Sequence, residues 1–100
     1  MTALVHPDAA QLELTGVLHA LSDPVRLAIV RGLAAGDAAR RCGSFELPVS
    51  KSTSTHHFRV LREAGVIEQW SEGTCRMTRL RRADLDARFP GLLDAVLGAE

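Results

Sequence analysis

Apolar residues recur at helical spacing in the first third of the chain. Residues 9–21 carry apolar side chains three or four positions apart, which predicts an amphipathic helix. Its apolar face consists of Leu14, Val17 or Leu18, and Leu21. Gly16 weakens this helix but permits another element to approach it closely.

A second helix is predicted to begin at Ser22-Asp23-Pro24. Either Ser22 or Asp23 can accept a hydrogen bond from a backbone N–H of the first turn. A proline at the first helical position loses no hydrogen bond, because the N–H at that position has no partner within the helix. Apolar side chains then recur every fourth residue, at Val25, Ile29 and Leu33. Gly36-Asp37 is the predicted end of this helix.

The stretch over residues 37–47 has the least clear pattern. It favours one short helix after Ser44. Pro48 would stop that helix, because the residue before a proline avoids helical backbone angles.

A longer helix, predicted over residues 50–64, has two chemically different faces. Ser50 is a natural N-cap, and Gly65 can adopt the left-handed conformation that ends a helix. At 100° per residue, one face comprises Thr53, Ser54, His57, Phe58, Val60, Leu61 and Ala64. The other face presents Lys51, Ser52, Thr55, His56, Arg59 and Arg62, with Glu63 near the end. Such a polar face suits a DNA groove, and an ordinary solvated surface is the alternative.

A β-hairpin and two short helices are predicted to complete the chain. Residues 66–70 and 75–80 read as strands, joined by a turn over 71–74 that contains Gly73. Residues 84–89 favour a short helix, and Pro90 opens the last helix. The broad apolar face of that helix comprises Leu92, Leu93, Val96 and Leu97. Length and pattern together predict one domain over residues 1–100.

Composition indicates a small core and a local concentration of positive charge. One Trp, three Phe and no Tyr leave the core mostly to Leu, Val, Ile and Ala, and a chain this small gains from burying apolar surface against a second copy. The formal net charge is zero, but residues 51–82 carry seven basic and three acidic side chains, a net charge of +4. This distribution suits a confined phosphate footprint and argues against indiscriminate coating of nucleic acid.

Signals for export or membrane insertion are not evident in the sequence. No apolar run approaches transmembrane length, and residues 1–8 lack a basic stretch followed by an apolar signal core. Two cysteines, Cys42 and Cys75, are too few for a disulfide framework. We therefore expect a soluble cytoplasmic protein with free thiols.

Three stretches resemble the ArsR/SmtB-type winged helix-turn-helix transcription regulators. Residues 18–27 are similar to the segment that opens the family's second helix. Residues 49–67 are similar to its recognition helix and the turn into the wing, and Glu72-Gly73 followed by Arg79-Leu80 is similar to the wing. The resemblance spans about residues 18–97. It implies a mainly α fold with a β-hairpin wing, in the order α-α-α-α-β-β-α.

The resemblance also implies a homodimer that binds operator DNA and represses transcription. In such proteins the N-terminal residues of the recognition helix enter the major groove. With wing residues and one further cation on the helix, the predicted DNA-binding set is Lys51, Ser52, Thr55, His56, Arg59, Thr74 and Arg76. His57 matches a common family histidine, for which we favour a packing or phosphate role over base readout.

Dimerisation is predicted to use the first and last helices, over residues 9–21 and 90–98. Their apolar residues exceed what one small core needs. The predicted interface comprises Leu14, Val17, Leu18, Leu92, Leu93, Val96 and Leu97.

The sequence predicts no cofactor and no metal centre. The family's thiol site uses closely spaced cysteines, but Cys42 has no neighbouring cysteine, and the family's other common site needs a histidine that residues 82–100 lack. Zinc requires four ligands in a tetrahedral array. A thiol-responsive or metal-responsive sensor stays an alternative, with scattered candidate residues His6, Asp8, His19, Cys42 and Cys75.

An enzyme is not expected. His56 and His57 are adjacent on a helix and point about 100° apart, so they cannot serve one substrate atom together. Neither a nucleophile-base-orienter set nor a Gly-rich phosphate loop is present. The other alternative is a winged-helix module that binds protein instead of DNA, and salt-dependent duplex binding would distinguish the two.

Overall fold

The computed structural model describes residues 4–36 and 38–99. The α-helices are α1 (Leu14–Leu21), α2 (Pro24–Gly36), α3 (Lys51–Glu63), α4 (Arg82–Arg88) and α5 (Leu92–Gly98). The strands are β1 (Arg40–Arg41), β2 (Ile67–Glu72) and β3 (Cys75–Leu80). Two single 3₁₀ turns, η1 (Ala9–Gln11) and η2 (Cys42–Ser44), complete the element order.

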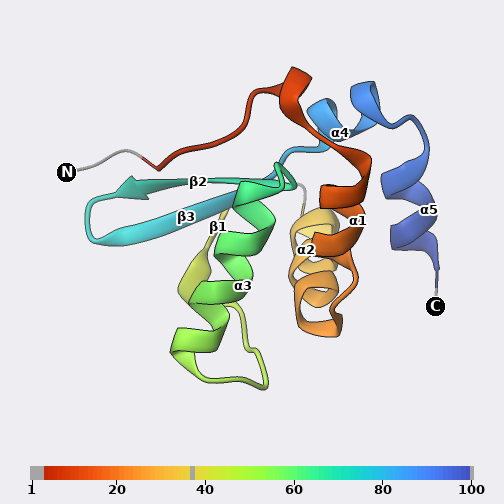
Figure 1. Ribbon diagram of the computed structural model, residues 1–100. Coiled ribbons are helices and arrows are strands. Elements are labelled where there is room, and N and C mark those ends of the chain that lie inside the picture. The colour runs from red at the N-terminus through yellow and green to blue at the C-terminus, as the bar shows by residue number, and fades with distance from the viewer. Residues whose placement is uncertain (1–3, 37, 100) are drawn as a thin grey trace.

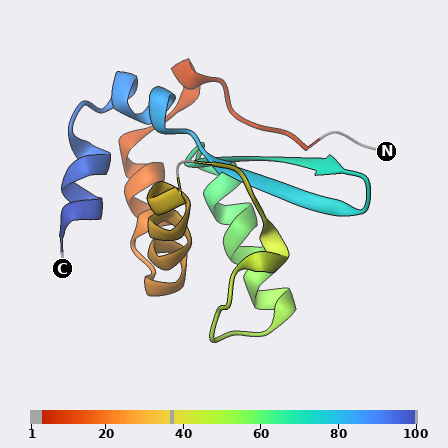
Figure 2. The ribbon, with the colours of Figure 1, turned by 180° about the vertical axis from the view of Figure 1, so that it is seen from behind.

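Three helices and a projecting hairpin define the architecture (Figure 1). α1, α2 and α3 pack against one another, and the β2–β3 hairpin extends away from the C-terminal end of α3. Seen from behind, α5 forms the edge of the molecule opposite the hairpin (Figure 2). This arrangement confirms the predicted mainly α fold with a β-hairpin wing.

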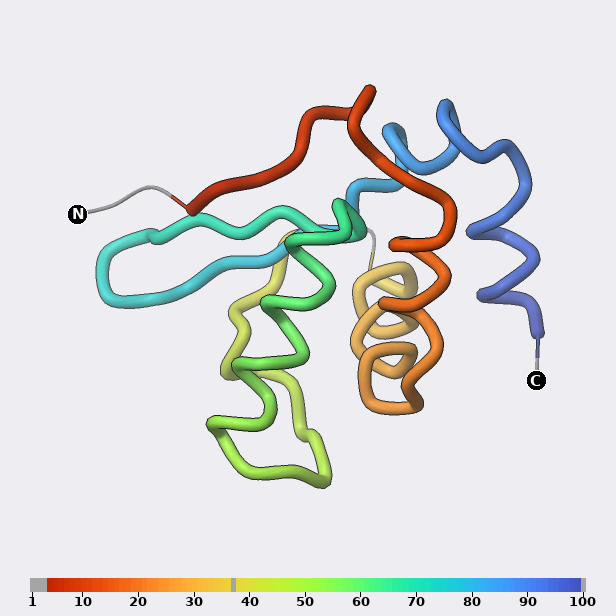
Figure 3. Tube along the Cα trace, in the orientation of Figure 1, coloured from red at the N-terminus to blue at the C-terminus, as the bar shows by residue number. Residues whose placement is uncertain are grey.

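The first predicted helix is interrupted. Instead of one helix over residues 9–21, a 3₁₀ turn ends at Gln11, and Leu12 adopts extended angles before α1 begins at Leu14. The tube in Figure 3 follows the chain through this bend. The break lets the Leu12 side chain, only 1% exposed, enter the core. Its carbonyl, freed from helical bonding, accepts a hydrogen bond from Nε of Arg88 at 3.1 Å.

α2 begins as predicted. Oδ1 of Asp23 accepts hydrogen bonds from the backbone N–H groups of Val25 and Arg26, at 2.8 and 3.2 Å, and so caps the first turn. Ile29 and Leu33 are buried, whereas Val25 is half-buried. The helix ends at Gly36, and the Asp37 half of the predicted stop lies outside the described residues.

The short helix predicted after Ser44 is wrong. Arg40 and Arg41 form β1, an edge strand of the antiparallel sheet of order β1-β3-β2. The 3₁₀ turn η2 follows them and ends before Phe45. The Arg40–Arg41 backbone forms its hydrogen bonds with β3, and residues 45–50 then run to the Ser50 cap of α3 without forming a helix. Ser44 reinforces the turn, because its Oγ donates to the carbonyl of Arg41 at 2.7 Å.

The hairpin has a regular register that ends in a two-residue turn. Glu72 pairs with Cys75, and Gly73 supplies the positive φ of 61° that such a turn needs. At the other end, Gly65 has a φ of 84° and separates α3 from β2. The core beneath these elements is mostly aliphatic and includes Leu12, Val17, Ile29, Val30, Leu33, Phe58, Leu61, Val66, Ile67, Leu85 and Leu93.

Candidate nucleic-acid interface

α3 carries the two faces that its sequence predicts. Its Ser50 cap accepts a hydrogen bond from the N–H of Thr53 at 3.3 Å. His57, Phe58 and Leu61 are buried. The exposed residues include Lys51, Ser52, Thr55, His56 and Arg59. Thr53, which the helical wheel assigns to the apolar side, is exposed because it lies in the first turn, before the buried residues begin.

A buried arginine fixes α3 to the first two helices. Arg26 is only 8% exposed, and its Nε and Nη2 donate to the carbonyls of Ala20 and His19 at 2.7 and 3.2 Å. Its Nη1 lies 3.1 Å from Nδ1 of His57. The arginine thereby caps the C-terminal end of α1 and holds the middle of α3. This arrangement supports the packing role expected for His57, whereas the sequence reasoning overlooked Arg26.

Asp23 lies beside the same cluster. Its Oδ1 is 4.0 Å from Nε2 of His57. The backbone hydrogen bond from Arg26 lowers the pKa of Asp23, helped by the bond from Val25 and by the charges of His57 and Arg26, while desolvation opposes them.

α3, from Lys51 to Arg62, borders a cavity of about 750 Å³, called here the basic cavity. Its walls come from α3, the η2 turn and the β2–β3 hairpin. Five of the seven predicted DNA-binding residues line it: Lys51, Thr55, Arg59, Thr74 and Arg76. Ser52 and His56 are exposed on α3 but do not line the cavity. Helix and wing therefore present most of the predicted set around one hollow.

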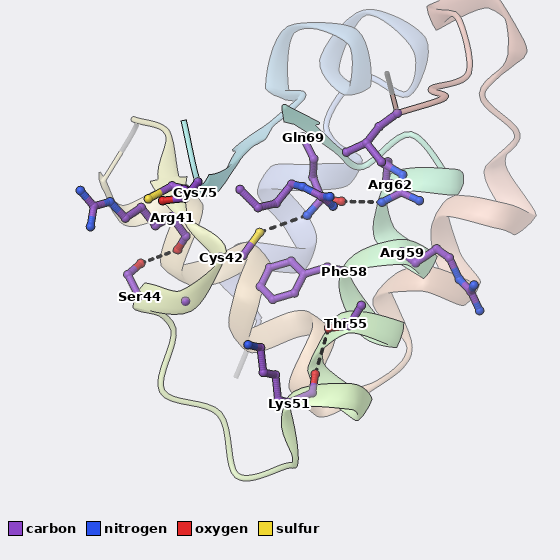
Figure 4. Close-up of a pocket in the computed structure, with 14 residues that line it drawn as sticks. Arg41, Cys42, Ser44, Lys51, Thr55, Phe58, Arg59, Arg62, Gln69 and Cys75 are labelled. Atoms are coloured by element: carbon purple, nitrogen blue, oxygen red, sulfur yellow. Dashed lines mark hydrogen bonds between the residues drawn. The ribbon is translucent and has the colours of Figure 1, made fainter. Parts of the chain in front are cut away.

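A hydrogen-bonded chain of side chains runs along the inner wall (Figure 4). Nη1 of Arg62 donates to Oε1 of Gln69 at 2.7 Å, and Nε2 of Gln69 donates to Sγ of Cys42 at 3.1 Å. The chain joins α3, β2 and the η2 turn. The sequence reasoning missed Gln69, because a single polar residue within a predicted strand carries no local sign of such contacts.

The positive charges of the chain differ in how they are compensated. Arg79 bonds to Glu68, Arg81 to Asp84 and Arg82 to Asp94. By contrast, no acidic side chain of the described residues forms a salt bridge with the five cations of the basic cavity, which are Arg41, Lys51, Arg59, Arg62 and Arg76. Positive charge is therefore concentrated there, on a chain whose formal net charge is zero.

Both cysteines are free thiols and line the basic cavity. Burial raises the pKa of Cys42, although the Gln69 hydrogen bond and the charges of Arg76 and Arg62 act in the opposite direction. Within residues 4–36 and 38–99, no group of three His, Cys, Asp or Glu side chains is placed to hold a metal ion. His6 instead accepts the backbone N–H of Gln69 through Nε2 at 3.0 Å.

The predicted dimer residues divide into three groups by burial in the protomer. Leu14 and Leu18 are 46% and 43% exposed on α1. Val17 and Leu93, at 1% and 2%, are buried in the core of the protomer, so including them in a partner surface was wrong. At helical spacing Val17 shares the inner side of α1 with Ala20 and Leu21. Leu92, Val96 and Leu97 are half-buried and pack partly on the core.

No helix in the described part of the chain is both long and apolar enough to cross a membrane.

The chain is similar to known helix-turn-helix proteins. A family model described as a helix-turn-helix domain matches residues 21–69. The uncharacterized HTH-type transcriptional regulator YceK of Bacillus subtilis (strain 168) is 32% identical over 82 residues, which cover 80% of this chain and 82% of that protein.

The similarity to solved structures extends over most of the chain. The transcriptional repressor BigR from Xylella fastidiosa is 26% identical, with a TM-score of 0.66 and coverage of 85% of this chain and 83% of that one. An ArsR-like transcriptional regulator from Rhodococcus sp. RHA1 is 30% identical, with a TM-score of 0.65 and coverage of 82% and 77%. All three are described as regulators and not as enzymes, in agreement with the sequence prediction.

Proposed function

This chain belongs to the ArsR-type winged helix-turn-helix transcription regulators, and from that premise we propose that it binds double-stranded operator DNA as a two-fold homodimer and represses transcription. The proposal treats residues 1–100 as one winged-helix domain that acts in the cytoplasm. The repressor role is taken from the similarity to BigR, which is described as a repressor.

One observation carries the DNA-binding proposal: the cations that face the hollow between α3 and the wing have no acidic partners among the described residues. Lys51, Ser52, Thr55 and His56 lie on the first turns of α3, as base-reading residues of a helix inserted in the major groove must. Arg59, Thr74 and Arg76 flank them and are proposed to contact phosphates.

The decisive experiment is titration of the purified protein with its own promoter duplex at several salt concentrations. The logarithm of the affinity should fall linearly with the logarithm of salt, by about 0.9 for each phosphate neutralised. Arg76→Ala should reduce that slope by about 0.9 per lost contact, and equally on operator and random duplex. Arg79→Ala is the matched control, because Arg79 is also an exposed wing cation but bonds to Glu68.

Base readout is tested by Lys51→Ala and His56→Ala. Each should reduce the preference for operator over random duplex by about 1–3 kcal/mol. Equal loss on both duplexes would show that these residues do not read sequence. Complete absence of salt-dependent duplex binding would favour the protein-interaction alternative.

The dimer proposal is supported by the two exposed leucines of α1 and by the half-buried Val96 of α5. Leu18→Glu changes a side chain that is 43% exposed in the protomer, so the protomer should still fold. Sedimentation should then show monomer, with weaker binding to an inverted repeat because the two half-sites are no longer linked. Val5→Glu is the control, because Val5 is an apolar residue that is 83% exposed and lies outside the predicted dimerisation helices. The Val5→Glu protein should remain a dimer.

A further inference from the structure

We propose that the basic cavity is a binding site for a small organic anion, with a carboxylate or phosphate group on an apolar body, and that occupancy competes with DNA. The competition depends on the proposed DNA-binding function, whereas the anion site itself does not. The site lies between α3, the η2 turn and the hairpin, within one protomer (Figure 4).

The size and the lining of the cavity suit such a ligand. A volume of about 750 Å³ falls in the range of small-molecule sites, about 300–1,000 Å³. Phe58, 5% exposed, and Gln69, 4% exposed, contribute buried wall surface, and Leu4 adds a further apolar side chain. Aromatic surface combined with a few directed polar groups is the usual composition of a small-molecule site.

The inner wall offers hydrogen-bond donors that the protein itself satisfies weakly. Nε of Arg62 is buried and has no hydrogen-bond partner among the described residues. The amide nitrogen of Gln69 donates to the Cys42 sulfur, which is a weak acceptor. A carboxylate or phosphate oxygen is a stronger acceptor than the sulfur for the Gln69 amide, and it would give the Arg62 guanidinium a charge-assisted partner.

The charge of the lining selects an anion over a neutral molecule. Five cations line the cavity, and no Asp or Glu is among the described residues that line it. Arg62 and Arg76 come close enough to Cys42 to act on its thiol electrostatically. An anion that enters the cavity reduces the electrostatic repulsion among these cations, which have no counter-charge of their own.

The inner residues distinguish a small anion from the duplex itself. Arg62 and Gln69 lie deeper than the exposed rim residues Lys51 and Thr55, which are proposed to meet the DNA. A free carboxylate on a flat ring is small enough to pass the rim and reach Arg62 and Gln69. A phosphate of a duplex cannot reach them, because the duplex itself rests on the rim residues. Because ligand and DNA share the rim, bound anion should exclude DNA.

The test uses the full chain, first without DNA, and three probes in calorimetry or equilibrium dialysis. The probes are 2-naphthoate, its neutral analogue 2-naphthamide, and inorganic phosphate, which lacks an apolar body. We expect one 2-naphthoate per chain with a dissociation constant below about 1 mM, and binding of the amide and of phosphate at least tenfold weaker. Arg41→Ala, which removes an exposed cation of the cavity, should weaken 2-naphthoate at least fivefold, whereas Arg79→Ala should not.

A second series measures operator affinity with and without 2-naphthoate. The wild-type protein should lose operator affinity at least fivefold at saturating 2-naphthoate, and the Arg41→Ala protein should lose less at the same concentration. Equal binding of 2-naphthoate and its amide, or equal binding by the Arg41 and Arg79 variants, overturns the anion site. Absence of 2-naphthoate binding overturns it as well. If the protein still binds operator in that case, the cations of the cavity would serve to contact duplex phosphates only. Retained 2-naphthoate binding with no operator binding would instead refute the proposed DNA function and leave the anion site standing.

Discussion

Replacing Gly65 with alanine should destabilise the protein more than its position in a turn would suggest. Gly65 has a φ of 84°, in the left-handed region that L-residues avoid. A Cβ added there would lie 2.0 Å from Cδ2 and 3.3 Å from Cγ of Leu12, and 3.3 Å from Cγ of Pro7. Leu12 is only 1% exposed, so it cannot move aside without disturbing the core.

Two separate costs can be assigned. The left-handed backbone costs an L-residue about 1–2 kcal/mol. Forcing extra volume against a packed leucine costs about 1–3 kcal/mol more. The Gly65→Ala variant should therefore lose about 2–5 kcal/mol of unfolding free energy, a large part of the roughly 5–15 kcal/mol that a domain has in total. Urea denaturation followed by far-UV circular dichroism measures this loss.

Control glycines separate the two costs. Gly73 also has a positive φ, of 61°, but a Cβ there meets nothing within 4 Å, so Gly73→Ala should show only the backbone cost of about 1–2 kcal/mol. Gly16→Ala, in α1 with no neighbour within 4 Å, should instead stabilise by about 0.5–1 kcal/mol.

A double-mutant cycle tests the contact itself. Leu12→Ala removes the atoms that a Cβ at Gly65 would meet, and by itself costs about 2–5 kcal/mol. The double variant should be more stable than the sum of the single changes predicts, by about 1–3 kcal/mol. Additivity within about 0.5 kcal/mol would refute the proposed packing of the N-terminal segment on the end of α3.

Three further predictions concern other residues of the site. Arg26→Met should lower the unfolding free energy by about 2–4 kcal/mol, because it removes three hydrogen bonds and leaves buried acceptors on α1 and α3, and urea denaturation measures the loss. The pKa of Asp23 is lowered in the folded state from its usual 3.8, so its charge stabilises the protein at neutral pH, and this stabilisation is lost as pH falls below about 4. Asp23→Asn, which can still cap α2, should therefore show a weaker dependence of unfolding free energy on pH in urea titrations between pH 2 and 7. The pKa of Cys42 is raised, so iodoacetamide at pH 8 should modify Cys42 more slowly in the folded protein than in urea-unfolded protein. Mass spectrometry of the alkylated peptides measures both rates, and equal rates would contradict the prediction.

Local sequence determined the elements whose signals lie within one or two turns. The serine cap, the two faces and the glycine stop of α3 were all predictable, because each depends on neighbours within four residues. Asp23 was one of the two predicted caps of α2, with Ser22 as the alternative. The turn predicted over residues 71–74 is shorter in the structure, because β2 continues to Glu72. The resemblance of residues 49–67 then assigned Lys51, Ser52, Thr55 and His56 to the recognition helix, and the separate match of Glu72-Gly73 and Arg79-Leu80 assigned the hairpin to the wing.

Tertiary structure alone decided the features that depend on partners distant in sequence. Strand β1 exists because β3, more than thirty residues later, offers an unpaired edge, and no periodicity in residues 37–47 could indicate it. Arg26 is buried because it caps α1 and reaches His57, thirty-one residues away, although an arginine in a helix is ordinarily exposed. Whether an apolar residue faces the core or a partner was likewise undecided by spacing, since Val17 and Leu18 are adjacent and only packing shows that Val17 is buried and Leu18 is not. The inner wall of the basic cavity, with Cys42, Arg62 and Gln69, combines three elements for the same reason: hydrogen bonds and close packing act between atoms that folding brings together, and local sequence carries no record of them.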